Sequence, residues 1–339
     1  MKFAPTRDQL DFGSAVGSLI TSSDAAGTAR SWADGNTEAG AKLWGRLGDV
    51  GVHGLATPES LGGFGESPVE LVLAFTELGR GGIPGPYVES AAFLPALLAS
   101  SSESELASSL VDGSTMATVA HPPVVPYAVD ASTADLVFVV DGLELRRATP
   151  VRARQSVDAT RKLWEVEAGD TVASVTEADL RHAHDTASLA VAAQLYGAGV
   201  QLLDTAVQYV KARRQFGRAV GEYQAVKHQL ADVKVALDFT RPLLWGAALA
   251  LPDRDAASSR SCSAAKVAAS RSALHAARTA LQVHGAIGYT AELDLSLWLT
   301  KVRALVTAWG TPAHHRASIL AGLTADGPMT KEQSHALWA

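Results

Sequence analysis

The chain has 339 residues, of which 47% are hydrophobic and 19% are charged, with a formal net charge of -6. This length supports two or three domains with a core that needs no cross-links, and the mildly acidic balance argues against a nucleic-acid partner. Cys262 is the only cysteine, which excludes an internal disulfide and a cysteine-based zinc site and fits a reducing, cytosolic setting.

No membrane segment is predicted. Asp8 and Asp11 interrupt the N-terminal stretch where an export signal needs an apolar run. The longest clean apolar run, LLWGAALAL, is too short to cross a bilayer. We therefore expect a cytoplasmic protein without a membrane partner.

The first third of the chain is predicted to be helical. Helical patterns cover 7–20, 37–50, 68–80 and 88–111, and Gly and Pro interrupt them at TPESLGGFGESP and GRGGIPGPY. We expect an N-terminal helical domain over 1–113.

The next segment, 114–182, is predicted to be a compact β domain. Its β-prone runs ATVA, DLVFVVDG, LELRRA, KLWEVEAG and TVASVT are separated by Pro, Gly and Asp. Short runs with such breaks are typical of a small sheet rather than of helices.

From Thr186 the pattern returns to helix, with apolar residues at alternating steps of four and three that predict one buried stripe. Its positions are Leu189, Ala193, Tyr196, Val200, Leu203, Val207 and Val210. Three further helices are predicted over about 222–251, 255–284 and 293–321.

Four long helices with short connections predict a four-helix bundle over 183–325, followed by a tail over 326–339. The third helix contains AAKVAASRSALHAARTAL. Because alanine allows helices to approach closely, we expect this helix to be the central or most buried one.

The stretch ARRQFGRAVGEYQ is predicted to end the first bundle helix, with Gly217 as its stop. Arginines at such a point can bind a phosphate bidentately, and Phe216 can pack on a flat ring. The alternative is that Arg213, Arg214 and Arg218 only complement the dipole of the helix.

A second motif, QVHGAIGYTAEL, follows the third bundle helix. Its glycines, Gly285 and Gly288, either let a ligand approach the backbone or only make a turn. Because 69 residues separate Arg213 from Gln282, one helical hairpin would bring the two motifs to the same end of the bundle.

Together these motifs resemble those of the acyl-CoA dehydrogenases. The family pattern R-x-x-F-G is matched from Arg213 to Gly217 and is followed by Gln224, and Q-x-x-G-G-x-G-[FY] is matched by QVHGAIGY with Ala286 in place of the second glycine. TPESLGGFG and ELGRGGIPGPYVES resemble two N-terminal segments of the family. The resemblance implies a mainly α fold with an N-terminal helical domain, a middle β domain and a C-terminal four-helix bundle.

The resemblance also implies a site for FAD between two subunits, to which this chain contributes across the interface. Arg213 would contact the pyrophosphate, Phe216 would pack near the cofactor, and Gln282 with the residues that follow would line the adenosine half. The full cofactor-binding set is Arg213, Gln215, Phe216, Gln224, Gln282, Gly285 and Ala286.

The chain departs from the family at the catalytic base, a Glu that removes the α-proton of an acyl thioester. One branch of the family has this Glu in Y-E-G-T, where this chain reads AWGT with Trp309. Another branch has it two residues before the Phe of the first motif, where this chain has Arg214. No Asp or Glu occurs between Leu295 and Leu323, so no catalytic residue is assigned.

The middle domain departs as well. It is shorter than usual, and the region ATVAHPPVVPYAVDASTADLVFVV contains neither the family's T-E-P-x-x-G-S-D nor its W-I-[ST] strand. We expect the flavin-ring and substrate pocket of this chain to be eroded.

Other candidates carry less weight. Glu292 is an acid near the right end of the bundle, but an acid is frequent there without being the base. His182 and His184 would not share a helix face, and His314 and His315 lack further ligands, so no metal site is predicted.

The favoured interpretation is the non-catalytic subunit of a heteromeric acyl-CoA dehydrogenase. A homologous catalytic subunit would supply the Glu and most of the acyl-CoA site. Such heteromers are associated with actinobacterial degradation of steroid side chains. The alternatives are a self-sufficient homodimer with an unrecognised base, such as Glu292, and a scaffold that kept the fold without the cofactor.

Overall fold

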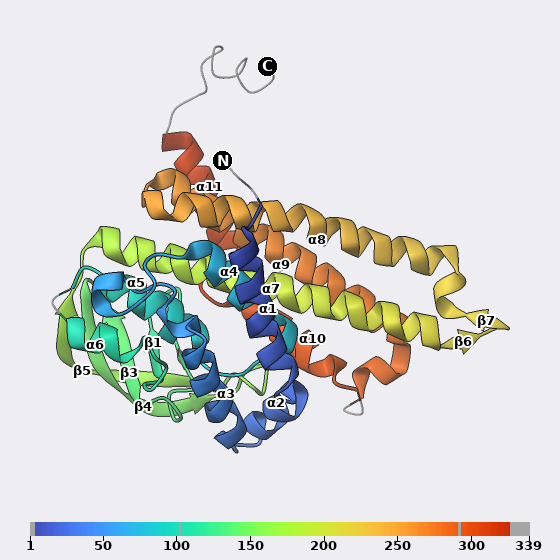
Figure 1. Cartoon of the computed structure of the whole chain (residues 1–339), viewed down its shortest axis with the longest axis horizontal. Helices are drawn as coiled ribbons and strands as arrows, with labels where there is room; N and C mark the ends of the chain where they lie inside the picture. Colours follow the sequence, from blue (N-terminus) through green and yellow to red (C-terminus); the bar gives the residue numbers. More distant parts are fainter. Residues whose placement is uncertain (1–3, 102, 291–292, 326–339) are drawn as a thin grey trace, which may run out of the picture.

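A computed structural model describes residues 4–101, 103–290 and 293–325 of the chain (Figure 1). It consists of a helical N-terminal part, a small sheet and a C-terminal bundle of long helices, in that order along the chain. This is the mainly helical architecture, with a small β region, that the sequence predicts. Glu292 lies outside the described residues.

The N-terminal part contains six α-helices and a π-helical turn. They are α1 Arg7–Thr21, α2 Ala25–Ala33, α3 Glu38–Asp49, α4 Pro68–Gly81, η3 Glu89–Phe93, α5 Leu94–Leu98 and α6 Ser104–Ser109, with short 3-10 turns at η1 Val52–Gly54 and η2 Glu59–Leu61. The prediction of one helix over 88–111 is wrong because the helical run formed by η3 and α5 ends at Leu98, and α6 begins only at Ser104. α2 was not predicted from the sequence; it begins after Asp24, whose side chain accepts from the Gly27 amide.

The sheet has five strands in the order β1-β3-β4-β5-β2. They are β1 Ala117–Ala120, β2 Ala128–Val129, β3 Leu136–Asp141, β4 Glu144–Arg154 and β5 Leu163–Ser174. β1 and β3 are parallel, whereas β3, β4, β5 and β2 pair antiparallel. Because β5 is continuous over the predicted runs KLWEVEAG and TVASVT, these are one strand rather than two.

The C-terminal part contains five helices where four were predicted. They are α7 Glu177–Ala212, α8 Gln224–Ala250, α9 Ala256–His284, α10 Leu295–Thr307 and α11 Pro312–Ala325. α7 begins before Thr186, at a capping box between Thr176 and Asp179. The predicted helix over 293–321 is divided because Trp309 and Gly310 adopt φ values of 54° and 103°, which a right-handed helix cannot contain.

α7, rather than α9, is the most buried helix of the bundle: 20 of its 36 residues are buried, against 14 of 29 in α9. It packs on α9 and α8 and also on α4 and α10. Its contact with α4 is backbone to backbone, since a Cβ at Gly197 would lie 1.9 Å from the Thr76 carbonyl oxygen. α7 is apolar and long enough to cross a membrane, but 83% of its most apolar window is buried inside the structure, as in a core helix.

Candidate functional site

The first motif forms a β-hairpin that projects past the ends of α7 and α8 (Figure 1). β6 Arg214–Gln215 pairs antiparallel with β7 Arg218–Ala219. Phe216 and Gly217 form the two-residue turn with φ values of 51° and 83°, as a type I′ turn requires. The prediction that Gly217 stops the helix is therefore wrong: α7 ends at Ala212, and Gly217 turns a hairpin.

Tyr223 holds this hairpin in shape. The Arg218 guanidinium lies 3.9 Å from the centre of the Tyr223 ring, and the Tyr223 hydroxyl donates to the Gln215 carbonyl at 3.3 Å. The Val220 amide also donates to the Arg213 carbonyl at 2.8 Å, which closes the base of the hairpin.

The predicted cofactor residues of the first motif are on the surface. Phe216 is 92% exposed at the tip, and the side chains of Arg213, Gln215 and Gln224 are also exposed. A phenylalanine so exposed at a hairpin tip buries no apolar surface within this chain. The hairpin therefore presents an aromatic ring and cations outward.

The second motif lies at the same end of the bundle. The His284 ring stacks on the ring of Tyr209, near the end of α7, with centroids 4.1 Å apart, and His284 Nδ1 donates to the Ala280 carbonyl at 2.7 Å. This stacking joins the end of α9 to the end of α7. The expectation that one helical hairpin brings the two motifs to one end is thus met by the geometry.

The surface of the second motif is open. Gln282, Gly285 and Ala286 are exposed, and a Cβ built at Gly285 meets nothing within 4 Å. A hollow of about 490 Å³ lies at the base of the hairpin. It is lined by Val207, Val210, Lys211, Ala219, Gly221, Glu222, Lys227 and Leu230, so two cations face one acid.

Trp309, at one expected position of the base, is buried in the junction between α10 and α11. Its Nε1 donates to Glu89 Oε1 at 3.0 Å, and its ring packs on Phe93 with centroids 4.5 Å apart. The other expected position, Arg214, is exposed on β6. The two positions therefore hold an enclosed indole and a solvent-facing guanidinium.

The junction around Trp309 is fixed by buried polar groups. Lys266 Nζ donates to the carbonyls of Leu305, Val306 and Gly310 at 3.2, 3.0 and 3.3 Å. Burial, with the charge of Arg161, lowers the pKa of Lys266 to about 7.

His315 supports the same junction: its Nε2 lies 3.0 Å from the Trp309 carbonyl oxygen, and its Nδ1 lies 3.1 Å from Ser263 Oγ. Burial lowers the pKa of His315 to about 4.

A cleft of about 470 Å³ lies between the sheet and this junction. Its walls come from η3, from the loops that follow β1 and β4, and from α10. Glu89 and Arg161 line the cleft and were missed by the sequence analysis. Glu89 contacts a residue 220 positions away, so no local pattern could have indicated its role.

The histidines gather beside Trp309. The His184 ring lies 5.8 Å from His314 and 6.1 Å from His315, and burial lowers the pKa of His184 to about 3. Among residues 4–101, 103–290 and 293–325, no group of three or more His, Cys, Asp and Glu side chains could hold a metal ion.

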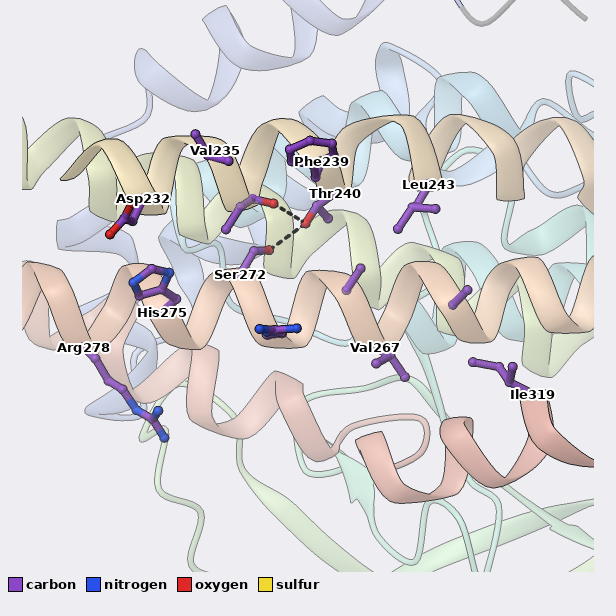
Figure 2. Close-up of a pocket in the computed structure, with 14 residues that line it drawn as sticks. Asp232, Val235, Phe239, Thr240, Leu243, Val267, Ser272, His275, Arg278 and Ile319 are labelled. Carbon is purple, nitrogen blue, oxygen red and sulfur yellow. Dashed lines mark hydrogen bonds between the residues drawn. The ribbon is translucent and has the colours of Figure 1, made fainter. Parts of the chain in front are cut away.

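A larger groove, of about 770 Å³, runs between α8 and α9 (Figure 2). Val235, Phe239 and Leu243 stand one helical turn apart on α8 and are 52%, 74% and 43% exposed. Thr240 donates to Ser272 at 3.0 Å across the two helices, which fixes their spacing. Apolar surface of this kind is typical of a protein contact rather than of a reaction centre.

Family models match most of the chain. The model of the acyl-CoA dehydrogenase N-terminal domain matches residues 6–110, and that of the C-terminal domain matches residues 183–324. The chain belongs to the acyl-CoA dehydrogenase family. Among curated acyl-CoA dehydrogenases, IpdE2 of Mycobacterium tuberculosis is 32% identical over 263 residues, which cover 76% of this chain and 79% of that protein. IpdE2 of Mycolicibacterium smegmatis is 32% identical over 80% of this chain and 84% of that protein.

Solved acyl-CoA dehydrogenase-like structures share the fold. The ChsE4-ChsE5 complex from Mycobacterium tuberculosis matches with a TM-score of 0.83 at 21% identity, over 97% of this chain and 100% of that chain. The Tcur3481-Tcur3483 steroid acyl-CoA dehydrogenase variant matches with a TM-score of 0.79 at 21% identity, over 94% of this chain and 98% of that chain. A glutaryl-CoA dehydrogenase from Mycobacterium smegmatis in complex with FADH2 matches with a TM-score of 0.80 at 17% identity, over 96% of this chain and 97% of that chain.

Proposed function

We propose that this chain is the non-catalytic subunit of a heteromeric, FAD-dependent acyl-CoA dehydrogenase. A homologous partner chain supplies the base and most of the acyl-CoA site, and this chain completes the partner's FAD site. The reaction is the α,β-desaturation of an acyl-CoA, with a steroid side-chain thioester as the proposed substrate class.

One observation carries the proposal: the whole predicted cofactor set is exposed at one end of the bundle. Arg213 and Phe216 face outward on the hairpin, and Gln282 faces outward beside it. Residues that served a cofactor held by their own chain would instead converge on an internal pocket. Their outward arrangement suits a cofactor held mainly by a neighbour.

The residues at this end fit part of FAD. A guanidinium such as that of Arg213 binds a pyrophosphate bidentately, and the open backbone at Gly285 admits a flat ring. The hollow beside them carries Lys211 and Lys227, which suits an anionic group. When bound, FAD accepts the hydride that leaves the acyl chain.

The junction at Trp309 does not fit the catalytic half. A base for the α-proton must lie within hydrogen-bond reach of that proton. Trp309 carries only an N–H donor, which is already bound to Glu89. This supports the assignment of proton removal to the partner chain.

The partner is proposed to be homologous for two reasons. The groove between α8 and α9 leaves the apolar side chains of Val235, Phe239 and Leu243 unburied, as expected of a subunit that is isolated from its assembly. The structural neighbours with this fold include two pairs of named chains, ChsE4-ChsE5 and Tcur3481-Tcur3483.

The test is to count FAD per chain in two preparations: the chain purified alone, and the complex recovered from the native host through a tag on this chain. We expect no stoichiometric FAD in the first, and FAD with acyl-CoA oxidation in the second. Arg213→Ala should lower the FAD content of the complex, whereas Arg152→Ala, an exposed arginine on β4, should leave it unchanged.

Two outcomes contradict this function. Stoichiometric FAD and acyl-CoA oxidation by the chain alone would establish the self-sufficient homodimer. A complex without FAD would establish the scaffold.

A further inference from the structure

The cleft beside Trp309 has the composition of a binding site that the proposed FAD role does not use. Its lining includes the charged residues Glu89, Arg161 and Arg303 and the apolar or aromatic residues Val124, Tyr127 and Leu163. A volume of about 470 Å³ lies within the range of pockets that bind small molecules. The walls are mostly aliphatic and aromatic, with a few charged groups.

Arg161 is the feature of this cleft that calls for a ligand. It is 9% exposed, and its guanidinium makes no hydrogen bond or ion pair with any residue that the structure describes. A desolvated cation without a partner is costly, and buried charges are normally paired. Since Arg161 lines the cleft, an anion in the cleft would supply the missing partner.

The nearby carboxylates contact other groups rather than Arg161, although Asp130 Oδ2 and Asp158 Oδ2 are buried without a hydrogen-bond partner among the described residues. Asp158 Oδ2 lies 3.2 Å from Lys301 Nζ, and its Oδ1 accepts from the Thr160 amide and hydroxyl. Asp130 Oδ1 accepts from Trp32 Nε1 at 3.3 Å and from the Lys162 amide at 3.1 Å. Arg161 is close enough to favour the charged form of both acids, but it pairs with neither.

The charges that face the cleft favour an anion. Arg303, exposed on α10, provides a second cation at the rim. Glu89 is the only acid of the lining: its Oε1 accepts from Trp309, and its Oε2 is enclosed in protein. Two cations therefore face one acid that is itself engaged. Of the two, the buried Arg161 has the greater need of an anionic partner.

The remaining walls of the cleft favour a ligand with a hydrocarbon portion. Val124, Val125 and Leu163 provide aliphatic surface, and the half-buried ring of Tyr127 provides flat aromatic surface. If a fully hydrated inorganic anion were bound, the apolar side chains of these walls would stay in contact with water. A carboxylate attached to a compact hydrocarbon frame would pair with Arg161 bidentately and cover the apolar walls.

We propose that this cleft binds an amphipathic organic carboxylate, with the carboxylate on Arg161 and the hydrocarbon frame against Tyr127 and the aliphatic wall. This site is separate from the exposed FAD motif at the hairpin.

The test is isothermal titration of the full-length chain with adamantane-1-carboxylate and with its uncharged analogue, adamantane-1-carboxamide. We expect the carboxylate to bind at least about tenfold more tightly than the amide, since a charge-assisted bidentate pair is lost in the amide. Arg161→Gln should weaken carboxylate binding at least about tenfold, and Arg303→Gln, at the solvated rim, only about twofold. Arg152→Gln on β4 is the matched control and should bind as the parent chain does.

Because a buried arginine can matter for folding, Ala304→Phe provides a second variant. It fills the cleft from the side of α10 without removing a charge, and it should abolish binding while the circular dichroism spectrum stays unchanged. Equal affinity for the carboxylate and the amide would overturn the proposal, as would unchanged binding by Arg161→Gln. Tighter binding of free coenzyme A than of the carboxylate would also overturn it, and would indicate that Arg161 and Arg303 bind phosphate groups.

Discussion

Lys266 is the residue on which the shape of the Trp309 junction depends. Its ammonium group is fully buried and donates to the carbonyls of Leu305, Val306 and Gly310. Two of these carbonyls end α10, and the third lies beyond Trp309. One side chain thus terminates the helix and positions the residue that stands where the family base is expected.

We predict that Lys266→Met lowers the free energy of unfolding by about 3 kcal/mol, because a similar volume is kept while buried carbonyl oxygens lose their donor. Urea unfolding monitored by tryptophan fluorescence measures this loss. Lys234→Met is the control: Lys234 is exposed and forms an ion pair with Asp238 on α8, so a change of about 0.5 kcal/mol or less is expected. Equal losses in both variants would refute the role assigned to Lys266.

Single residues were predictable from the sequence only where a linear motif contained them. The placement of Arg213 and Gln282 at one bundle end follows from motif spacing and helix length. Glu89 and Arg161 could not be found in this way, because their surroundings are made by segments far apart in the chain. The roles of the cofactor residues stay predictions until the FAD content is measured.

At the scale of elements, Tyr223 stabilises the hairpin formed by β6 and β7. It contacts both strands, through the Arg218 guanidinium and through the Gln215 carbonyl. The hairpin has two residues in each strand and no core of its own, so it would be marginal without these contacts. Tyr223 is therefore a positioning residue for the exposed motif.

We predict that Tyr223→Ala speeds hydrogen exchange at the Val220 amide about tenfold, because a cation–π contact and a hydrogen bond together contribute about 1 to 2 kcal/mol. Tyr223→Phe keeps the ring and should give a smaller increase. Arg214→Ala is the matched control on the same hairpin, since the hydrogen bond and the cation–π contact of Tyr223 are made with Gln215 and Arg218 instead. Exchange at Val220 that is identical in all three variants would show that the tyrosine does not hold the hairpin.

The errors at the scale of elements have local physical causes. Phe-Gly is not one of the usual hairpin dipeptides, so Gly217 was assigned to a helix end. The break between α10 and α11 had a signal in Gly310-Thr311-Pro312, which the prediction of one helix over 293–321 did not use. α2 was missed because its short sequence AAGTARSWA contains residues of weak helix propensity and depends on the cap at Asp24.

For the whole molecule, the order of helical part, sheet and bundle follows from the helical periodicity of the long segments and from the short β-prone runs between them. The depth of α7 could not be derived in this way, since the helix is apolar on more than one face and contacts two parts of the chain. The division at 1–113, 114–182 and 183–325 remains a proposal.

Acid should destabilise the whole fold through its buried histidines. Burial lowers the pKa of His53 to about 4, of His184 to about 3 and of His315 to about 4, from an ordinary value of 6.5. The unfolded chain therefore binds more protons than the fold between about pH 6.5 and 4, and stability falls as the pH falls through this window. Burial raises the pKa of Asp130 and Asp185 to about 6, which opposes this trend with fewer groups and smaller shifts.

We predict that the urea midpoint of the full chain decreases steadily between pH 7 and pH 5, and that His184→Gln makes this decrease shallower. The His184 ring is surrounded by His121, His314, His315 and Lys266, so protonation would add a charge among basic groups. Removing one such imidazole should reduce the slope of the unfolding free energy against pH by about 1.4 kcal/mol per pH unit, which is the value for a single proton. His228→Gln, at an exposed position on α8, should keep the parent slope, and a His184→Gln slope equal to the parent's would contradict the assignment.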